Sequence, residues 1–193
     1  MKKVMVLLVV SLCIAGGSLQ AQRHAVKTNL LSDATATFHL GWEIAVSSRW
    51  TLDFSASYNP WTFSHNKKWK HWTLQPEMRW WLCEKLNGHF LGMHIYGGQF
   101  NIGNLDTSIH FLGTDFRKLR DSRYEGWKVG GGIAYGYSWM LARHWNMELE
   151  IGIGYSYSDY DRFACERCSE QVSSGHHHYF GPTRMVVGMV YVF

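Results

Sequence analysis

After its first residues the chain has no long hydrophobic run, and it has little net charge and only three prolines. A transmembrane helix needs about 20 consecutive apolar residues, so a membrane-embedded form of this protein would have to use strands. The formal net charge of +4 is too small an excess to indicate a protein that binds nucleic acid. The glycines at 130–132 lie within a strand-like segment and open no helix, which argues against a phosphate-binding loop.

The N-terminus has the organisation of a secretory signal peptide. Lys2 and Lys3 precede an apolar stretch at 4–15, and small and polar residues follow as far as Ala21. The apolar stretch is too short for a membrane anchor. We therefore expect a signal peptide at 1–21 and a mature domain at 22–193. Without the two lysines the formal charge falls to +2, because 17 of the 19 basic residues remain against 15 acidic ones.

A period of two dominates the mature chain. In WTLDFSASYN (50–59), apolar and polar residues alternate completely, which indicates a strand with one apolar face. The pattern returns at 127–139 and 145–158, more weakly at 40–47, 72–82 and 91–96, and at the two ends, 24–31 and 179–193. The total is eight, an even number, as bacterial membrane barrels require. Ten Trp, ten Tyr, ten Phe and 19 Gly also suit a membrane barrel better than a soluble domain.

The connections between these segments alternate in length. Those at 48–49, 83–88 and 142–144 are short, and those at 32–39, 60–70, 101–126 and 159–178 are long. Short periplasmic turns and long extracellular loops alternate in this way in membrane barrels. The sequence therefore predicts an all-β fold, an eight-stranded antiparallel up-and-down transmembrane β-barrel.

The polar faces of the predicted strands hold charges of both signs. An eight-stranded barrel is just wide enough for side chains to fill its lumen, and buried ions must be paired or hydrated. We expect a charge network in the lumen, and an ion pathway is the functional alternative. The network is predicted to contain Lys27, Glu43, Asp53, Glu77, Arg79, Lys128, Glu148, Glu150 and Arg184.

Aromatic residues gather near the strand ends, as expected of the two membrane interfaces. On the short-turn side we expect Trp50, Trp80, Trp139, Trp145 and Tyr191. On the long-loop side we expect Trp42, Tyr58, Trp61, Trp69, Trp72, Trp127, Tyr155 and Tyr157.

The C-terminal segment alternates apolar residues and ends on Phe193. With Tyr191 it resembles the terminal strand signal that the barrel assembly machinery reads in outer-membrane proteins. Pro76 interrupts the pattern at 72–82, because proline cannot donate to a ladder. We expect a bulge or locally open pairing there.

Two cysteines and a histidine run in the last long connection are the main candidates for chemistry. Cys165 and Cys168 with His176, His177 and His178 resemble half of a zinc site, but a single pair at this spacing is a weak motif. A disulfide between Cys165 and Cys168 is the favoured interpretation in an oxidising compartment. No spacing marks a catalytic triad, so no catalytic residue or cofactor is predicted.

The chain resembles small outer-membrane barrels of the OmpA/OmpX size class. AVKTNLL (25–31), SYNPWTFSHNKKWKHW (57–72), QPEMRWWLCEKLNGHFLG (75–92) and GGQFN (97–101) resemble, more closely, an uncharacterised family of such barrels that carries a domain-of-unknown-function label. Some members are encoded near fimbrial genes. The resemblance covers nearly the whole mature chain, implies the outer membrane of a Gram-negative bacterium, and brings no catalytic residues.

The function expected from these features is structural or interactive: envelope integrity, adhesion or support of a surface appendage. The expected partners are outer-membrane lipid, the barrel assembly machinery, and a surface or fimbrial protein that contacts the long loops. One alternative is a lipid- or envelope-modifying barrel enzyme. The other is a soluble periplasmic carrier of the lipocalin type.

Overall fold

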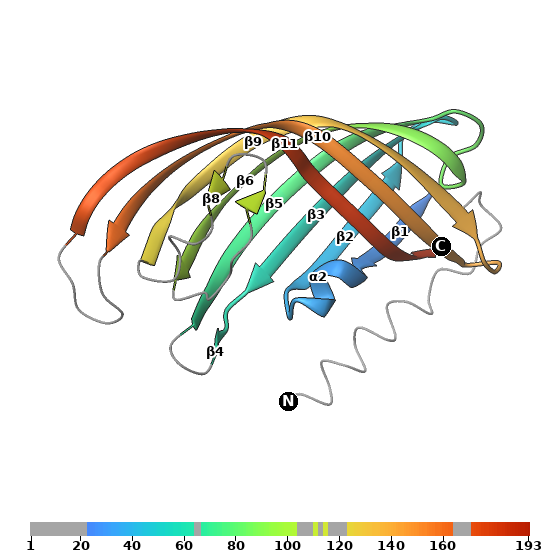
Figure 1. Cartoon of the computed structure of the whole chain (residues 1–193). Helices are drawn as coiled ribbons and strands as arrows, with labels where there is room; N and C mark the ends of the chain where they lie inside the picture. Colours follow the sequence, from blue (N-terminus) through green and yellow to red (C-terminus); the bar gives the residue numbers. More distant parts are fainter. Residues whose placement is uncertain (1–22, 64–66, 104–109, 112–113, 116–122, 164–170) are drawn as a thin grey trace.

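The computed structural model describes residues 23–63, 67–103, 110–111, 114–115, 123–163 and 171–193, so the predicted signal peptide lies outside it. Eight long antiparallel strands account for most of this part of the chain (Figure 1). They are β1 (His24–Asn29), β2 (Phe38–Ala45), β3 (Trp50–Asn59), β5 (Lys67–Trp81), β6 (Gly88–Gly103), β9 (Arg123–Met140), β10 (Trp145–Phe163) and β11 (Gln171–Val192). The short elements are α2 (Leu30–Ala34), β4 (Thr62–Phe63), β7 (His110–Phe111) and β8 (Thr114–Asp115).

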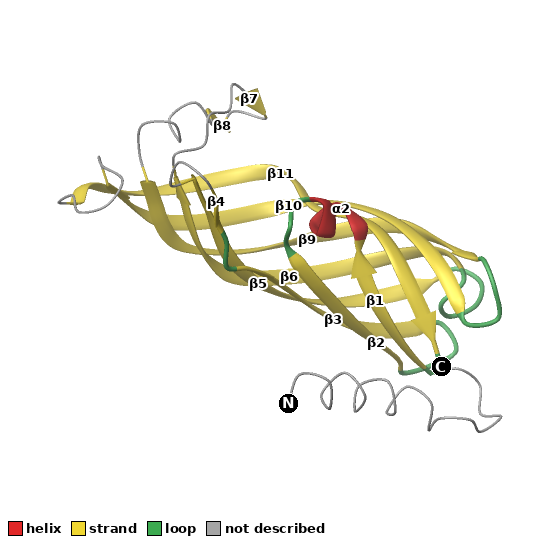
Figure 2. Cartoon of the chain, turned by 90° about the horizontal axis from the view of Figure 1, so that it is seen from below, coloured by secondary structure: helices red, strands yellow, loops and turns green. Residues whose placement is uncertain are grey.

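The long strands follow one another around a closed ring. Their spatial order is β3-β2-β1-β11-β10-β9-β6-β5, and β3 pairs with β5 to complete it. The first and last strands meet from Ala25↔Val192 to Asn29↔Gly188. Figure 2 shows the strands tilted across the barrel. The predicted all-β, eight-stranded up-and-down barrel is thus confirmed as a fold.

The two ends of the barrel differ. At one end lie the connections 46–49, 82–87 and 141–144 and the C-terminal Phe193; we call this the turn end. The opposite loop end holds α2 and β4, and β9, β10 and β11 project beyond the rest of the ring there (Figure 1). Much of the predicted 159–178 loop is strand, since β10 continues to Phe163 and β11 begins at Gln171. Polar residues on both faces hide the period of two in this part.

The helix α2 replaces the predicted end of the first strand at 30–31. Asn29 ends β1, and its side-chain oxygen accepts from Leu31 N at 3.2 Å, which caps the helix. The same side chain donates to Met185 O at 3.0 Å and accepts from Val187 N at 3.2 Å on β11. The capped turn therefore fills part of the gap left by β1, which is much shorter than β11. Among the described residues, no helix is long and apolar enough to cross a membrane.

Two of the ladder irregularities involve the two strand prolines. Between β5 and β6 the paired residues pass from Leu74↔Gly97 to Glu77↔His94 without a change of register, so the pairing at Pro76 is locally open. Two register shifts lie elsewhere, both between β10 and β11: one at Arg162/Phe163 and one at Gly152/Ile153. At the second, Gly152 faces Arg184, but the next residue, Ile153, faces Pro182. This two-against-one arrangement is a β-bulge.

An apolar plug fills the lumen at the turn end. Trp81 packs on Phe90 with ring centroids 4.7 Å apart, and its Nε1 donates to Thr51 Oγ1 at 2.9 Å. Asn146 Nδ2 donates at 2.6 Å to the carbonyl of Leu86 in the 82–87 turn. The plug consists of Ala25, Trp81, Leu86, Phe90, Val190 and Val192. The sequence pattern places Trp81 on the inner face but does not predict the plug.

Trp81 and its neighbour Trp80 test this packing directly. Trp81 is fully buried, whereas Trp80 points outward with 37% of its surface exposed. Trp81→Ala is expected to lower the free energy of unfolding by about 3–5 kcal/mol, because it empties a large volume inside a closed ring. Trp80→Ala is expected to cause a smaller loss. Urea titrations in detergent micelles measure both, and equal losses would contradict the plug.

Candidate functional site

The outer surface of the barrel is apolar around the ring. Ile133 on β9 is 61% exposed, Ile151 on β10 is 54% exposed, and Ile95 on β6 is 66% exposed. Such residues are normally buried in a soluble domain, and a contiguous patch of this extent marks an interaction surface. The same outward face carries other exposed residues from most of the strands, among them Leu40, Phe54, Leu74, Met78, Leu91, Met93, Val129, Leu149, Ile153 and Met185.

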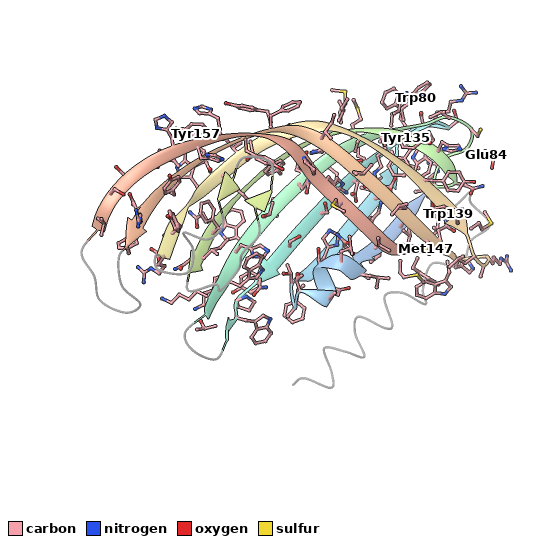
Figure 3. All side chains as sticks on the ribbon, viewed as in Figure 1. Trp80, Glu84, Tyr135, Trp139, Met147 and Tyr157 are labelled. Atoms are coloured by element: carbon pink, nitrogen blue, oxygen red, sulfur yellow. The ribbon has the colours of Figure 1, made fainter. Side chains whose placement is uncertain are left out.

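Aromatic side chains flank this apolar belt at both ends. Figure 3 shows Trp80 on the outer surface near the turn end and Tyr157 near the loop end. The Trp80 ring lies 6.5 Å from that of Trp50, and at the loop end the Tyr157 ring lies 5.5 Å from that of Trp127. Two rings of amphipathic aromatics at the edges of an apolar belt are typical of a membrane barrel.

Trp42 does not lie where the sequence pattern placed it. Its ring is 6.1 Å from that of His24, which stacks on Phe193 at 5.9 Å. Trp42 therefore belongs to the turn end rather than the loop end. Because the strands are tilted, the number of residues from a strand end does not give height along the barrel.

Inside the barrel, Arg79 is the centre of a network of ion pairs. Its guanidinium nitrogens lie 2.8 Å from Glu77, 3.1 Å from Glu43, 2.9 Å from Glu148 and 2.6 Å from Glu150. The arginine side chain has no accessible surface. With Asp53 of β3 at 3.7 Å, five carboxylates thus converge on one buried cation, which satisfies the requirement that buried charges be paired.

Two further cations complete the network. Arg184 on β11 lies 2.9 Å from Asp53, 2.8 Å from Glu77 and 2.7 Å from Glu150. Lys27 on β1 pairs with Glu43. Its ammonium also lies 3.4 Å from Glu148 and 3.8 Å from Asp53. The charge network is therefore formed by three cations and five carboxylates on six strands: Lys27, Arg79, Arg184, Glu43, Asp53, Glu77, Glu148 and Glu150.

Lys128 is the one predicted member that the structure leaves out. Within the described part of the chain, no carboxylate lies within ion-pair distance of its ammonium, which lies 6.0 Å from the centre of the Tyr96 ring. Lys128 faces inward as predicted, but it lies nearer the loop end than the charge network. The alternation of side chains shows which face of the strand a residue occupies but not its position along the barrel axis. For this reason the prediction that Lys128 belongs to the charge network was wrong.

Glycines give the charge network its room. A Cβ atom at Gly92 of β6 would lie 2.2 Å from Glu77 Oε1, and one at Gly41 of β2 would lie 2.6 Å from Lys27 Cγ. Larger residues at these two inward positions would displace the charged side chains. The inward glycines of the sequence pattern therefore serve the packing of long charged side chains in a narrow lumen.

The charge network and the apolar plug are stacked on each other. The Arg79 guanidinium lies 4.4 Å from the centre of the Phe90 ring, a cation–π contact. Thr51 joins the two layers, because it accepts from Trp81 and donates to Glu43. Arg79, Glu43 and Trp81 are completely buried. The described side chains thus fill the lumen at both levels, and this arrangement favours a structural role over an ion pathway.

Of the five candidates for metal or redox chemistry, the two cysteines lie outside the described residues and the three histidines lie on β11. Because Cys165 and Cys168 lie outside, the predicted disulfide and zinc site remain predictions. His176 and His178 share the outer face of β11, where their rings lie 6.3 Å and 5.2 Å from that of Tyr157. In the described ranges no group of three or more His, Cys, Asp or Glu side chains is placed to hold a metal ion. His177 faces the other side of the strand, opposite Ser158.

Comparison with known families gives one result. A family model described as "Protein of unknown function (DUF3575)" matches residues 4–193, so the chain belongs to this family. No curated protein and no solved structure matches the chain.

Removal of Arg79 tests the charge network. Arg79→Leu leaves five carboxylates without their central cation in a closed space, and we expect the free energy of unfolding to fall by about 3–5 kcal/mol. Arg49→Leu, in the exposed 46–49 turn, removes the same charge and should change stability little. Urea unfolding followed by near-UV circular dichroism compares the two variants. A stable Arg79→Leu barrel would show that these ion pairs do not hold the lumen together.

Proposed function

We propose that this DUF3575 member is a small outer-membrane β-barrel of a Gram-negative bacterium, with a structural or surface-contact role and not a catalytic one. Residues 1–21 act as its export signal, and the strand that ends in Tyr191 and Phe193 is read by the barrel assembly machinery. Outer-membrane lipid is its first partner, and a surface protein, of which a fimbrial subunit is one kind, contacts the loop end.

The observation that carries this proposal is the inverted distribution of side chains. Ile151 on the outer face is 54% exposed, whereas its neighbour Glu150 on the inner face is 2% exposed. Burial of apolar surface drives the folding of water-soluble proteins, and β10 shows the opposite arrangement. Lipid around the barrel would cover the apolar belt, and the lumen would shelter the charges. A lipocalin-type carrier would instead need an apolar interior for its ligand.

The projecting ends of β9, β10 and β11 support a surface-contact role. They continue past the aromatic ring at the loop end, and they carry a cluster of rings in which Tyr124 lies 5.3 Å from Tyr160. Among the described strands, β1 is the one that pairs with this side of β11, and it does so only at 188–192. A strand edge without a partner beyond the membrane is a feature that a protein partner can bind.

Fractionation tests the membrane assignment. The full-length protein, expressed with its native N-terminus, is expected to sediment with outer membranes and to need detergent for extraction. On gels, the unboiled sample should migrate faster than the boiled one, because a closed barrel stays folded in detergent. Recovery from the soluble periplasm without detergent would contradict the proposal and would favour a soluble carrier.

A matched pair of substitutions separates lipid contact from simple exposure. Ile151 and Val172 are 54% and 56% exposed, but Ile151 lies within the apolar belt and Val172 lies at the register shift on the projecting part of β11. Ile151→Arg is expected to cost about 2–4 kcal/mol of stability in lipid vesicles. Val172→Arg should cost little. In a water-soluble barrel the two substitutions would behave alike, and that result would rule out the membrane assignment.

A further inference from the structure

A polar cavity of about 410 Å³ occupies the lumen on the loop-end side of the charge network. Arg184, a member of that network, lies at one side of the cavity, and Ser32 and Thr35 of the α2 segment line it at the loop end. The rest of the lining comes from Asn29 of β1, from Thr37 and from β2, β3, β5, β6, β9, β10 and β11. Its volume lies within the range of small-molecule sites in proteins. The cavity is thus a third layer of the lumen, beyond the apolar plug and the charge network.

The polar groups that line this cavity are basic or neutral, and none is acidic. Its polar groups include the ammonium of Lys128, the imidazoles of His39 and His71, the amide of Gln75 and several Ser and Thr hydroxyls, and none of the lining residues is Asp or Glu. Two of these groups lack partners. Within the described ranges, Gln75 Nε2 and His39 Nδ1 are buried without a hydrogen bond. Buried polar groups are normally satisfied, so these atoms indicate a missing partner.

Lys128 is the charged group that the charge network does not use. Its side chain is half-buried, lines the cavity, and lies 6.0 Å from the ring of Tyr96. A cation shielded from water without a counter-ion is costly. The three cations of the charge network each form a close ion pair with a carboxylate. They are Lys27, Arg79 and Arg184. An anion in the cavity would supply Lys128 with a counter-ion, which each of the other three cations already has.

We propose that the cavity binds a small oxyanion that carries hydroxyl groups, such as a sugar phosphate or a uronate. Its charged group pairs with Lys128, and its hydroxyls meet the Ser, Thr, Gln75 and His39 groups of the lining. Trp69 and Tyr96, which also line the cavity, provide apolar ring surface of the kind that packs against sugars. The proposal requires only the barrel fold, so it stands or falls separately from the membrane assignment.

Calorimetric titration of the detergent-purified full chain tests this site. Glucose 6-phosphate and glucuronate are the anionic probes, and glucose is the neutral one. We expect both anions to bind and glucose to bind at least about tenfold more weakly, because only the anions can form a charge-assisted hydrogen bond with the Lys128 ammonium. Lys128→Met keeps approximately the length of the side chain and should weaken the binding of both anions by a similar factor. Lys85→Met in the 82–87 turn removes the same charge at the opposite end and should have no effect.

Three results would overturn the proposal: no heat of binding with either anion, equal affinity for glucose, or unchanged anion affinity in Lys128→Met. The wild-type titration alone decides the first two, so the test does not depend on the folding of a variant. Without ligand, Lys128→Met should be at least as stable as the wild type, because it removes an unpaired cation. A marked loss of stability would mean that Lys128 serves the fold instead.

The anionic group has two sources, a free small molecule or the end of a surface glycan. A parallel titration with a delipidated, phosphorylated oligosaccharide from lipopolysaccharide distinguishes them. Tighter binding than that of glucose 6-phosphate assigns the site to a glycan. Weaker binding assigns it to a free sugar phosphate or uronate, and both results agree with an oxyanion site.

Discussion

Arg79 extends from β5 into a lumen that is too narrow for water to surround its charge, and the rest of the interior is arranged to compensate. Carboxylates from β2, β5 and β10 surround it, and these carboxylates bring in Lys27 from β1 and Arg184 from β11. The ion pairs repay the desolvation of the charges only if their geometry is good. The charge network therefore links strands that are distant in sequence and favours one closure of the ring over other registers.

The strict alternation of side chains along the strands is required by the same need to keep charged groups inside the lumen and paired. A slip of one residue would move every inward side chain to the outer face. In β10 such a slip would place Glu148 and Glu150 on the belt now occupied by Leu149 and Ile151. Each face thus specifies the register independently, one by charge pairing and the other by exclusion of charge. β6 contributes both space, because Gly92 leaves room for the Glu77 side chain, and the Phe90 ring that contacts Arg79.

The strands and their faces could be predicted from sequence because each face repeats every two residues over ten or more positions. The inward face alone predicted the eight members of the charge network, but it also added Lys128, which forms none of these ion pairs. The height of a residue along the barrel axis could not be predicted. It depends on the tilt of the strands, and the tilt depends on strand pairings that the pattern of one strand does not contain. Lys128 and Trp42 were misplaced for this reason. The helix α2 depends on the contacts of Asn29 with β11, and the projecting ends of β10 and β11 are polar on both faces, so neither has a periodic signal.

The order of the three lumen layers limits how a ligand reaches the inner cavity. Below the cavity, the charge network and the apolar plug fill the lumen with side chains such as Arg79 and Trp81, which have no accessible surface. A solute that enters at the loop end therefore has to leave by the same end. A chamber closed on one side suits capture of a ligand better than its passage. Because Arg184 both pairs with Asp53 and lines the cavity, the layer that stabilises the ring also forms the floor of the proposed site. Binding in the cavity and stability of the ring are thus coupled through one side chain.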